Sequence, residues 1–387
     1  MIKYFLAEDT IDSKDIDRLI AWLKGAPRLT KGEVTLEFEA RWSGWVGKRY
    51  SVFNNSGSSA NLLMYAALDL SGRLKNKKVI VPSVGWVTSV APAMQFGFQP
   101  IMCEADPDTF GLDLDHLESL LKKHRPGSVL LVQVLGVPHK MARIMALKKK
   151  YGFILMEDAC AAIGASWRGK KAGGFGDLSS FSFYFGHQMS TIEGGMVSTD
   201  DPRFRDLLLM LRSHGWGKDL EPAARQKLVR KYKIDDFHSP FVFYIPGFNL
   251  RSTDLNAFIG LGQLDKLDWI ISRRQENHLR FKERLDGKLY VQKPDPGSVI
   301  CSIHFGALAR DGAQRRRIVK ALVDNGIETR IFSAGNLGLH PFWTDRYKRA
   351  SFPMADRIHH TGFFLPNNPS LKPEDVDFIA DVVEKAL

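Results

Sequence analysis

Strand-like and helix-like segments alternate through the first half of the chain, and no other feature constrains the fold as strongly. Apolar runs typical of buried strands occur at residues 79–82, 100–104, 129–134 and 153–158. Apolar side chains at helical spacing occur between and around them, at residues 60–70, 112–123 and 141–151. Because parallel strands are joined by crossover helices, this order predicts an α/β fold with a doubly wound, largely parallel sheet.

The segments on either side of this core predict further helices and a second domain. Helical apolar spacing occurs at residues 11–23, 32–47, 202–211 and 256–285. A strand–helix–strand unit is predicted near the C-terminus, at residues 302–306, 316–325 and 326–330. We therefore expect an N-terminal and large domain over residues 1–250, then a linking helix and a smaller α+β domain over residues 251–387.

One long segment does not fit this alternation. Residues 218–246 are polar, charged and poorly periodic. Such a stretch is typical of an excursion from the core, and we expect it to cover a cleft.

Charge and composition exclude several classes of protein. The chain has 54 Lys and Arg against 43 Asp and Glu, a net charge of +11, but its basic clusters at 75–78, 148–150 and 315–317 are short and separated. This pattern is typical of solvated faces, so we expect no nucleic-acid partner. We also expect no membrane partner and a cytoplasmic location, because there is neither a long apolar run nor a leader-like N-terminus.

The cysteines exclude most metal and disulfide chemistry. Cys103, Cys160 and Cys301 lie far apart in the sequence. They lack the paired spacing of a zinc site or a disulfide framework, and an iron–sulfur cluster normally needs four thiolates. We therefore expect no metal.

A small-residue turn follows the first predicted strand of the core. The sequence from Tyr50 to Asn61 reads YSVFNNSGSSAN, and a helix is predicted to start beside it. Gly57 lets the backbone approach a ligand, and the N–H groups near Ser58 form the positive end of that helix. The turn is a candidate phosphate site, although many ordinary strand–helix turns have the same composition.

Two further segments contain residues that could take part in catalysis or ligand binding. Asp158 lies at the carboxyl end of an apolar run that is predicted to be a strand. Open α/β sheets bind their ligands at the carboxyl ends of their strands. Downstream, Phe181, Phe183 and Phe185 alternate with Ser182 and Tyr184, which predicts a strand. Turn residues 193–195 precede a second strand, so the segment is predicted as strand, loop, strand with His187 in the loop.

These segments together resemble the DegT/DnrJ/EryC1/StrS sugar aminotransferases, from about residue 30 to the end of the chain. The resemblance implies the aspartate-aminotransferase-like (type I) fold with pyridoxal 5'-phosphate (PLP) or pyridoxamine 5'-phosphate. In most of that family a lysine at the position of His187 binds the cofactor covalently. No lysine lies between Lys171 and Lys218. With a histidine at this position, the chain resembles the sugar 3-dehydratase branch of the family.

The resemblance also implies roles for cofactor-binding residues. It assigns the cofactor phosphate to the turn with Gly57 and Ser58 and to the hydroxyl of Ser182. It places Trp86 over the cofactor ring and pairs Asp158 with the pyridine nitrogen, although a core tryptophan and a capping aspartate remain alternatives. Ala161 departs from the family, which usually has a polar residue there, so another group or water must bind the 3-oxygen of the ring.

The segment from Gly247 to Asn256 resembles the family's subunit-crossing segment. There the residue equivalent to Asn249 reaches the cofactor phosphate of the partner subunit, which implies a homodimer with shared active sites. His214, Arg251 and Arg330 are candidate substrate-binding residues. Arg330 has the bidentate donors that a carboxylate or pyrophosphate needs, although a surface ion pair fits it equally well.

The implied reaction follows from His187. Histidine cannot bind the cofactor as lysine does, but it can act as a general base near neutral pH. We expect L-glutamate to generate the pyridoxamine form, and a nucleotide-linked 4-keto-6-deoxysugar then to lose its C3 hydroxyl. By resemblance the first candidate substrate is GDP-4-keto-6-deoxymannose, for deoxysugar and lipopolysaccharide O-antigen biosynthesis. Ordinary amino transfer to a keto-sugar and a catalytically silent PLP- or sugar-nucleotide-binding protein are the alternatives.

Overall fold

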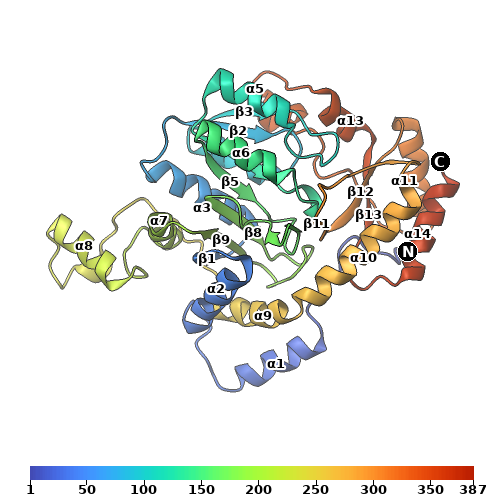
Figure 1. Cartoon of the computed structure of the whole chain (residues 1–387). Coiled ribbons are helices and arrows are strands. Elements are labelled where there is room, and N and C mark those ends of the chain that lie inside the picture. The colour runs from blue at the N-terminus through green and yellow to red at the C-terminus, as the bar shows by residue number, and fades with distance from the viewer.

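A seven-stranded mixed sheet forms the centre of the computed structural model, which describes residues 1–387 (Figure 1). Its strands, in spatial order, are β1 (Tyr50–Asn54), β9 (Gly195–Thr199), β8 (Leu178–Ser182), β5 (Ile154–Asp158), β4 (Ser128–Val132), β2 (Lys78–Pro82) and β3 (Gln99–Cys103). β9 pairs antiparallel with both of its neighbours, and all other pairs in the sheet are parallel. The prediction of an α/β fold with a largely parallel sheet is confirmed, and the antiparallel pairs of β9 make the sheet a mixed one.

Helices cover both faces of this sheet. They are α2 (Glu33–Val46), α3 (Gly57–Leu70), α4 (Val87–Gln95), α5 (Leu114–His124), α6 (Met141–Tyr151) and α7 (Pro202–Arg212). Val79 and Val81 of β2 join the cluster that contains α3 and α7, whereas Ile80 joins the cluster of α5 and α6. Successive strand residues point to opposite faces, so these central strands are apolar on both sides.

The helices around the sheet differ from the predictions in one place. Residues 256–285, predicted as one helix, form α9 (Asp254–Asp265) and α10 (Leu267–Leu285), with the break at Lys266. The Lys266 ammonium lies 2.5 Å from a carboxylate oxygen of Asp12 and 2.6 Å from one of Asp15. These ion pairs connect the break to α1 (Ser13–Leu23), which Figure 1 shows below α9.

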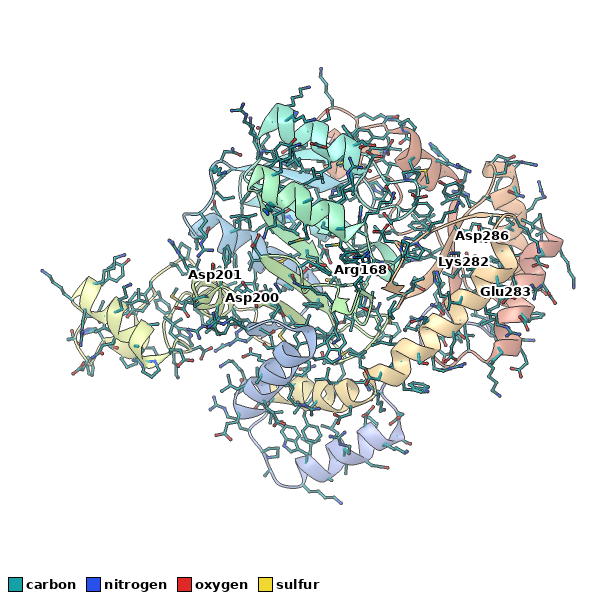
Figure 2. All side chains as sticks on the ribbon, viewed as in Figure 1. Arg168, Asp200, Asp201, Lys282, Glu283 and Asp286 are labelled. Carbon is teal, nitrogen blue, oxygen red and sulfur yellow. The ribbon has the colours of Figure 1, made fainter.

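A smaller antiparallel sheet lies at the other end of α10. It contains β10 (Tyr290–Val291), β12 (His304–Leu308) and β13 (Gly362–Pro366). The helices of this part are α11 (Gly312–Asp324), α12 (Pro341–Thr344), α13 (Pro353–Thr361) and α14 (Pro373–Lys385). Figure 2 labels Lys282, Glu283 and Asp286 at the end of α10 that lies beside this sheet and its helices. α10 therefore connects the region of the large sheet to the small one.

The remaining elements are short. A third sheet consists of β11 (Ser298–Val299), β6 (Ser166–Trp167) and β7 (Lys170–Lys171), all antiparallel. Single 3₁₀ turns occur as η1 (Val134–Gly136), η2 (Ser239–Phe241) and η3 (Leu337–Leu339). No helix is both long and apolar enough to cross a membrane.

Two strand predictions were wrong. Residues 326–330 form no strand of a sheet: Ile327 makes only an isolated bridge with Tyr4, because the N-terminal segment covers this edge. The strand predicted over residues 181–185 ends at Ser182. Beyond it the chain turns, since the backbone N–H of His187 donates to the carbonyl of Tyr184 at 2.9 Å.

Residues 218–246 leave the body of the protein, as their composition predicted. They contain α8 (Pro222–Tyr232), none of whose residues is buried. Figure 1 shows α8 projecting away from the sheet beyond α7. None of these residues lines the cavity described below, so the segment does not cover that cavity in its own chain.

Candidate active site

The largest concentration of predicted site residues lies around a cavity of about 550 Å³ at the carboxyl ends of the parallel strands. Asp158 ends β5, Ser182 ends β8, and Trp86 lies four residues after the end of β2. Parallel strands place these ends at one edge of the sheet, where open α/β sheets bind ligands. The cavity brings together Gly57, Ser58, Trp86, Asp158, Ser182, His187 and Arg330.

The N-terminus of α3 forms one end of this cavity. Ser56 caps the helix, its side chain accepting from the backbone N–H of Ser59 at 3.1 Å. The first N–H groups of a helix have no acceptor within it, so those of Gly57 and Ser58 are available to an anion. A Cβ added to Gly57 would lie 2.4 Å from the Cβ of Ser182. Only glycine therefore lets the Ser182 hydroxyl and the helix end share one small cradle.

Asp158 is held in a fixed orientation at the floor of the cavity. Its Oδ2 accepts from the Nδ2 of Asn61 at 2.9 Å and from the hydroxyl of Ser89 at 2.6 Å. Its Oδ1 accepts from the backbone N–H of Cys160 at 3.0 Å. The side chain of Asn61 is itself oriented by the Ser180 hydroxyl, 2.7 Å away. Three donors to one buried carboxylate restrict its rotation.

Trp86 lies at the rim of the cavity. It precedes the first turn of α4, and its side chain is 51% exposed. A core tryptophan, the alternative reading of this residue, would be buried. The indole face is thus available to a planar ring.

His187 lies in the loop between β8 and β9, on the wall of the cavity. Its ring is half-buried, and Nδ1 has neither solvent nor a hydrogen-bond partner. Loss of hydration lowers the pKa of His187 to about 4, an effect that nearby Arg274 and Arg330 reinforce and Asp158 opposes. The ring is therefore neutral at pH 7, which is the form that accepts a proton.

No lysine lines the cavity. The small sheet and the segment after α11 also line the cavity. Among their residues are His304, which is buried, and Arg330, whose guanidinium lies 5.4 Å from the ring of Phe364. Glu328 lies on the same wall and accepts from the backbone N–H of Leu6 at 2.8 Å. The N-terminal segment thereby contributes to the wall.

Three predicted residues lie outside this cavity. His214, Asn249 and Arg251 group together beside the turn that precedes α3, where the carbonyl of Leu250 accepts from the N–H of Asn55 at 3.0 Å. Asn249 is exposed and forms a backbone bridge with Ser213. The Nη2 of Arg251 lies 3.4 Å from the Nε2 of His214. The roles of these three residues stay predictions.

The departure at Ala161 has a structural counterpart. Ala161 lines the cavity, and its carbonyl accepts from the Nε2 of Gln188 at 2.7 Å. The same nitrogen donates to the carbonyl of Cys301, also at 2.7 Å. The residue after His187 is therefore bonded to both the Asp158 loop and the segment before β12.

Several residues of the site were not predicted from the sequence. Asn61 and Ser89 orient Asp158, and His304 and Glu328 line the wall. Asn61 had a usable signal, because it lies four residues after Gly57 and hence on the same face of α3. The contributions of His304 and Glu328 depend on how distant segments pack, which no local pattern reveals.

The cavity fits a flat, phosphorylated, electron-poor ring: an anion cradle at α3, an oriented carboxylate, and an exposed indole. Comparison with known proteins decides the family. A family model described as the DegT/DnrJ/EryC1/StrS aminotransferase family matches residues 9–384. The chain belongs to this family. The DegT/DnrJ/EryC1/StrS family depends on PLP, and the present chain has the aspartate-aminotransferase-like fold.

Relatives within the DegT/DnrJ/EryC1/StrS family include proteins named as 3-dehydratases and as GDP-perosamine synthases. A GDP-4-keto-6-deoxy-D-mannose 3-dehydratase from Yersinia pseudotuberculosis is 33% identical, over 87% of this chain and 86% of its own. A GDP-perosamine synthase from Escherichia coli O157:H7 is 28% identical, over 92% and 91%. A GDP-4-keto-6-deoxymannose-3-dehydratase solved with a trapped PLP–glutamate geminal diamine is 28% identical, with a TM-score of 0.90 over 98% of this chain and 100% of that structure.

Proposed function

We propose that this protein is a lyase that removes the C3 hydroxyl of a nucleotide-linked 4-keto-6-deoxysugar, with L-glutamate as the amino donor. One observation carries the proposal: the cavity contains a neutral histidine beside Asp158 and no lysine. The reaction balances, because glutamate is oxidised to 2-oxoglutarate while the sugar is reduced by loss of its hydroxyl as water. The nitrogen of glutamate leaves as ammonia.

The cofactor-binding residues have separate tasks in this proposal. The N–H groups of Gly57 and Ser58, with the Ser182 hydroxyl, bind the phosphate of PLP. Asp158 keeps the pyridine nitrogen protonated, and Trp86 contacts the ring. When bound, PLP carries the amino group of glutamate and accepts electrons from the carbon next to it. Without a lysine, the chain holds this group by non-covalent contacts alone.

His187 moves the protons in this reaction. Its neutral ring accepts a proton from the carbon that bears the transferred amino group, and returns one to the departing C3 oxygen. Because burial lowers the pKa of His187, the ring is neutral at pH 7 and has the free nitrogen lone pair that accepting a proton requires. The two steps follow each other, so one imidazole can serve both.

The substrate follows from charge and from the relatives. Arg330 provides a guanidinium on the cavity wall for the diphosphate of a nucleotide sugar. We propose GDP-4-keto-6-deoxymannose as the first substrate to test, since the 33% identical relative is named for it. The product would then enter deoxysugar and lipopolysaccharide O-antigen biosynthesis.

We also propose a homodimer with shared sites. Asn249 is exposed beside the turn that binds the phosphate, although it is absent from its own cavity. Three aromatic side chains in and near the projecting segment are strongly exposed: Phe237 at 87%, Phe241 at 72% and Phe243 at 59%. Aromatic surface of this extent favours burial against a second copy.

Amino transfer to a keto-sugar is the second candidate function. The similarity to a GDP-perosamine synthase favours it, because that relative is 28% identical and matches 92% of the chain, against 87% for the 33% identical 3-dehydratase. The absence of a cavity lysine opposes it, since an aminotransferase releases its product through that residue. A protein that only binds PLP or a sugar nucleotide would show no reaction with glutamate.

The test substitutes His187. His187→Lys and His187→Asn should each lower dehydration at least about 100-fold, because the general base is lost. His360→Asn is the matched control, as His360 is exposed and absent from the cavity, and it should change the rate less than about twofold. Retention of dehydration in both His187 variants would contradict the proposed role.

A further inference from the structure

Arg274 is a fully buried cation next to the candidate general base. It lies in α10 with 1% of its surface exposed, and it forms no ion pair. One terminal nitrogen, Nη2, donates to the carbonyl of His187 at 3.2 Å. The other, Nη1, donates to the carbonyl of Asn367 at 2.6 Å and lies 3.1 Å and 3.3 Å from those of Ile303 and Ser302.

The carbonyls that bind Nη1 belong to one corner of the small sheet. Ser302 and Ile303 immediately precede β12, and Asn367 immediately follows β13. These two strands pair antiparallel with His304 opposite Pro366, so the three carbonyls lie at the same end of the sheet. The side chain of Asn367 returns bonds to the carbonyls of Arg274 and Ser302, at 3.2 Å and 2.9 Å.

We propose that Arg274 is a positioning residue for His187, holding the histidine loop in fixed register with the small sheet and placing a permanent positive charge behind the imidazole. The proposal rests on the proposed function for its catalytic meaning. Carbonyl oxygens are weak partners for a guanidinium compared with carboxylates. Because no carboxylate neutralises it, the charge of Arg274 remains effective at the neighbouring ring.

Gln188 supports the same arrangement from the next position. Its Nε2 donates to the carbonyls of Ala161 and Cys301, each at 2.7 Å. The His187 carbonyl is thus bonded to α10, and the Gln188 side chain to the Asp158 loop and to the segment before β12. A loop held at both residues keeps the imidazole at one distance from the reacting carbon, and small displacements of such groups are costly in rate.

The charge effect has a definite sign. The titratable and charged groups that share the cavity or act on the His187 ring come from five places in the chain. They are Asp158 and Cys160 at and just after the end of β5, Tyr184 and Glu193 in the same loop, Arg274 of α10, His304 of β12, and Glu328 and Arg330 after α11. Burial lowers the pKa of His187 most, Asp158 raises it, and Arg274 and Arg330 lower it. Removal of the Arg274 charge should therefore raise the pKa of His187.

The first experiment measures the His187 ring directly, in the full-length chain labelled with ¹³C at the Cε1 of histidine. Loss of one resonance in His187→Asn assigns the signal, and a pH titration gives the pKa. In Arg274→Gln we expect that pKa to rise by roughly 0.5 to 1 unit. In Arg274→Lys, which keeps a charge, we expect a smaller change. The matched control is Arg273→Gln, because Arg273 is the adjacent, partly exposed residue bonded to Glu276 and the carbonyl of Leu371.

The second experiment measures turnover and separates positioning from a general loss of stability. Arg274→Lys should lower kcat about 10- to 100-fold with little change in KM, because the fork that fixes the His187 carbonyl is lost. In Arg274→Gln the acid limb of the pH profile of kcat should move to higher pH, because the pKa of His187 rises. If Arg274→Gln does not fold, the proposal is tested by comparing the kcat of Arg274→Lys with that of Arg273→Lys.

A His187 pKa in Arg274→Gln equal to that of the wild type, or a kcat in Arg274→Lys equal to that of Arg273→Lys, would overturn the proposal. The titration needs no substrate, so the coupling of Arg274 to His187 would be seen even if the enzyme proved to transfer amino groups. Conversely, dehydration without that coupling would reject only the role of Arg274.

Discussion

At the scale of single residues, the chemistry depends on donors that orient a few acidic and basic groups. Asp158 illustrates this, because two side chains and one backbone N–H fix both of its oxygens. Its carboxylate is thus prepared for a cationic partner in the cavity before any ligand arrives. Such preorganisation is where enzymes gain most of their electrostatic stabilisation.

Asp158→Asn should therefore lower turnover by roughly 10²-fold or more, because the amide cannot keep the pyridine nitrogen protonated. Ser89→Ala removes one of the two side-chain donors and should have a smaller effect in the same direction. Steady-state kinetics with glutamate, followed by release of 2-oxoglutarate, measures both variants. Equal rates for Asp158→Asn and the wild type would show that the carboxylate is not used.

The residues of the site differ in how visible they are from the sequence. Asp158 and His187 were predictable because each stands in a local segment that resembles a known family. Arg274 was not, since it lies 87 residues from His187 along the chain and meets only its carbonyl. Backbone contacts of this kind leave no pattern in the sequence, and packing alone creates them.

At the scale of elements, the proposed phosphate site requires the N-terminus of α3, at Gly57, to lie close to the end of β8, at Ser182. Gly57→Ala would place a methyl group 2.4 Å from the Cβ of Ser182, so one of the two segments must move. We expect at least a tenfold loss of PLP affinity, since the N–H groups and the Ser182 hydroxyl would no longer converge. Titration of the apoprotein by PLP absorbance measures this.

Gly44→Ala provides the control for that substitution. Gly44 lies inside α2, and a Cβ there would meet no atom within 4 Å. Alanine is the better helix former by about 0.5–1 kcal/mol, so this variant should be as stable as the wild type or slightly more so, with unchanged PLP affinity. Equal PLP affinities for both glycine variants would contradict the assignment of the cradle.

Helices and strands were predictable to different degrees. The helix over residues 141–151 agrees with α6 because its periodicity is local and its C-cap is a glycine. The strand predicted at residues 326–330 failed because a strand needs continuous pairing, and this segment makes only isolated contacts, with Tyr4 of the N-terminal segment and with Phe364 of β13. β13 was missed for the related reason that its place is set by β12, more than fifty residues earlier.

At the scale of the whole molecule, neutral buried histidines make stability depend on pH. His139, His278 and His304 are at least 95% buried, and burial is the largest cause of the lowered pKa of each, to about 4 for His139 and about 3 for His278. The hydrogen bonds of His139 also require the neutral form, since its Nδ1 accepts from the N–H of Lys140 at 2.7 Å.

In the unfolded chain these histidines take up a proton near pH 6.5. The folded state therefore loses stability as pH falls from about 6.5 towards 4, and these groups contribute no pH dependence above that window. The free energy of unfolding should be lower at pH 5 than at pH 7.5 by the order of several kcal/mol. Urea unfolding followed by circular dichroism at the two pH values measures it, and an unchanged midpoint would contradict neutral burial.

The mass of the product distinguishes dehydration from amino transfer. The full-length protein would be incubated with PLP, L-glutamate and GDP-4-keto-6-deoxymannose, beside other nucleotide-linked 4-keto-6-deoxysugars. We predict a product that lacks one oxygen atom, formed together with ammonia and 2-oxoglutarate. An amino sugar, in which the 4-keto oxygen is replaced by nitrogen and the C3 hydroxyl is retained, would contradict the account and assign the cavity of His187 to amino transfer.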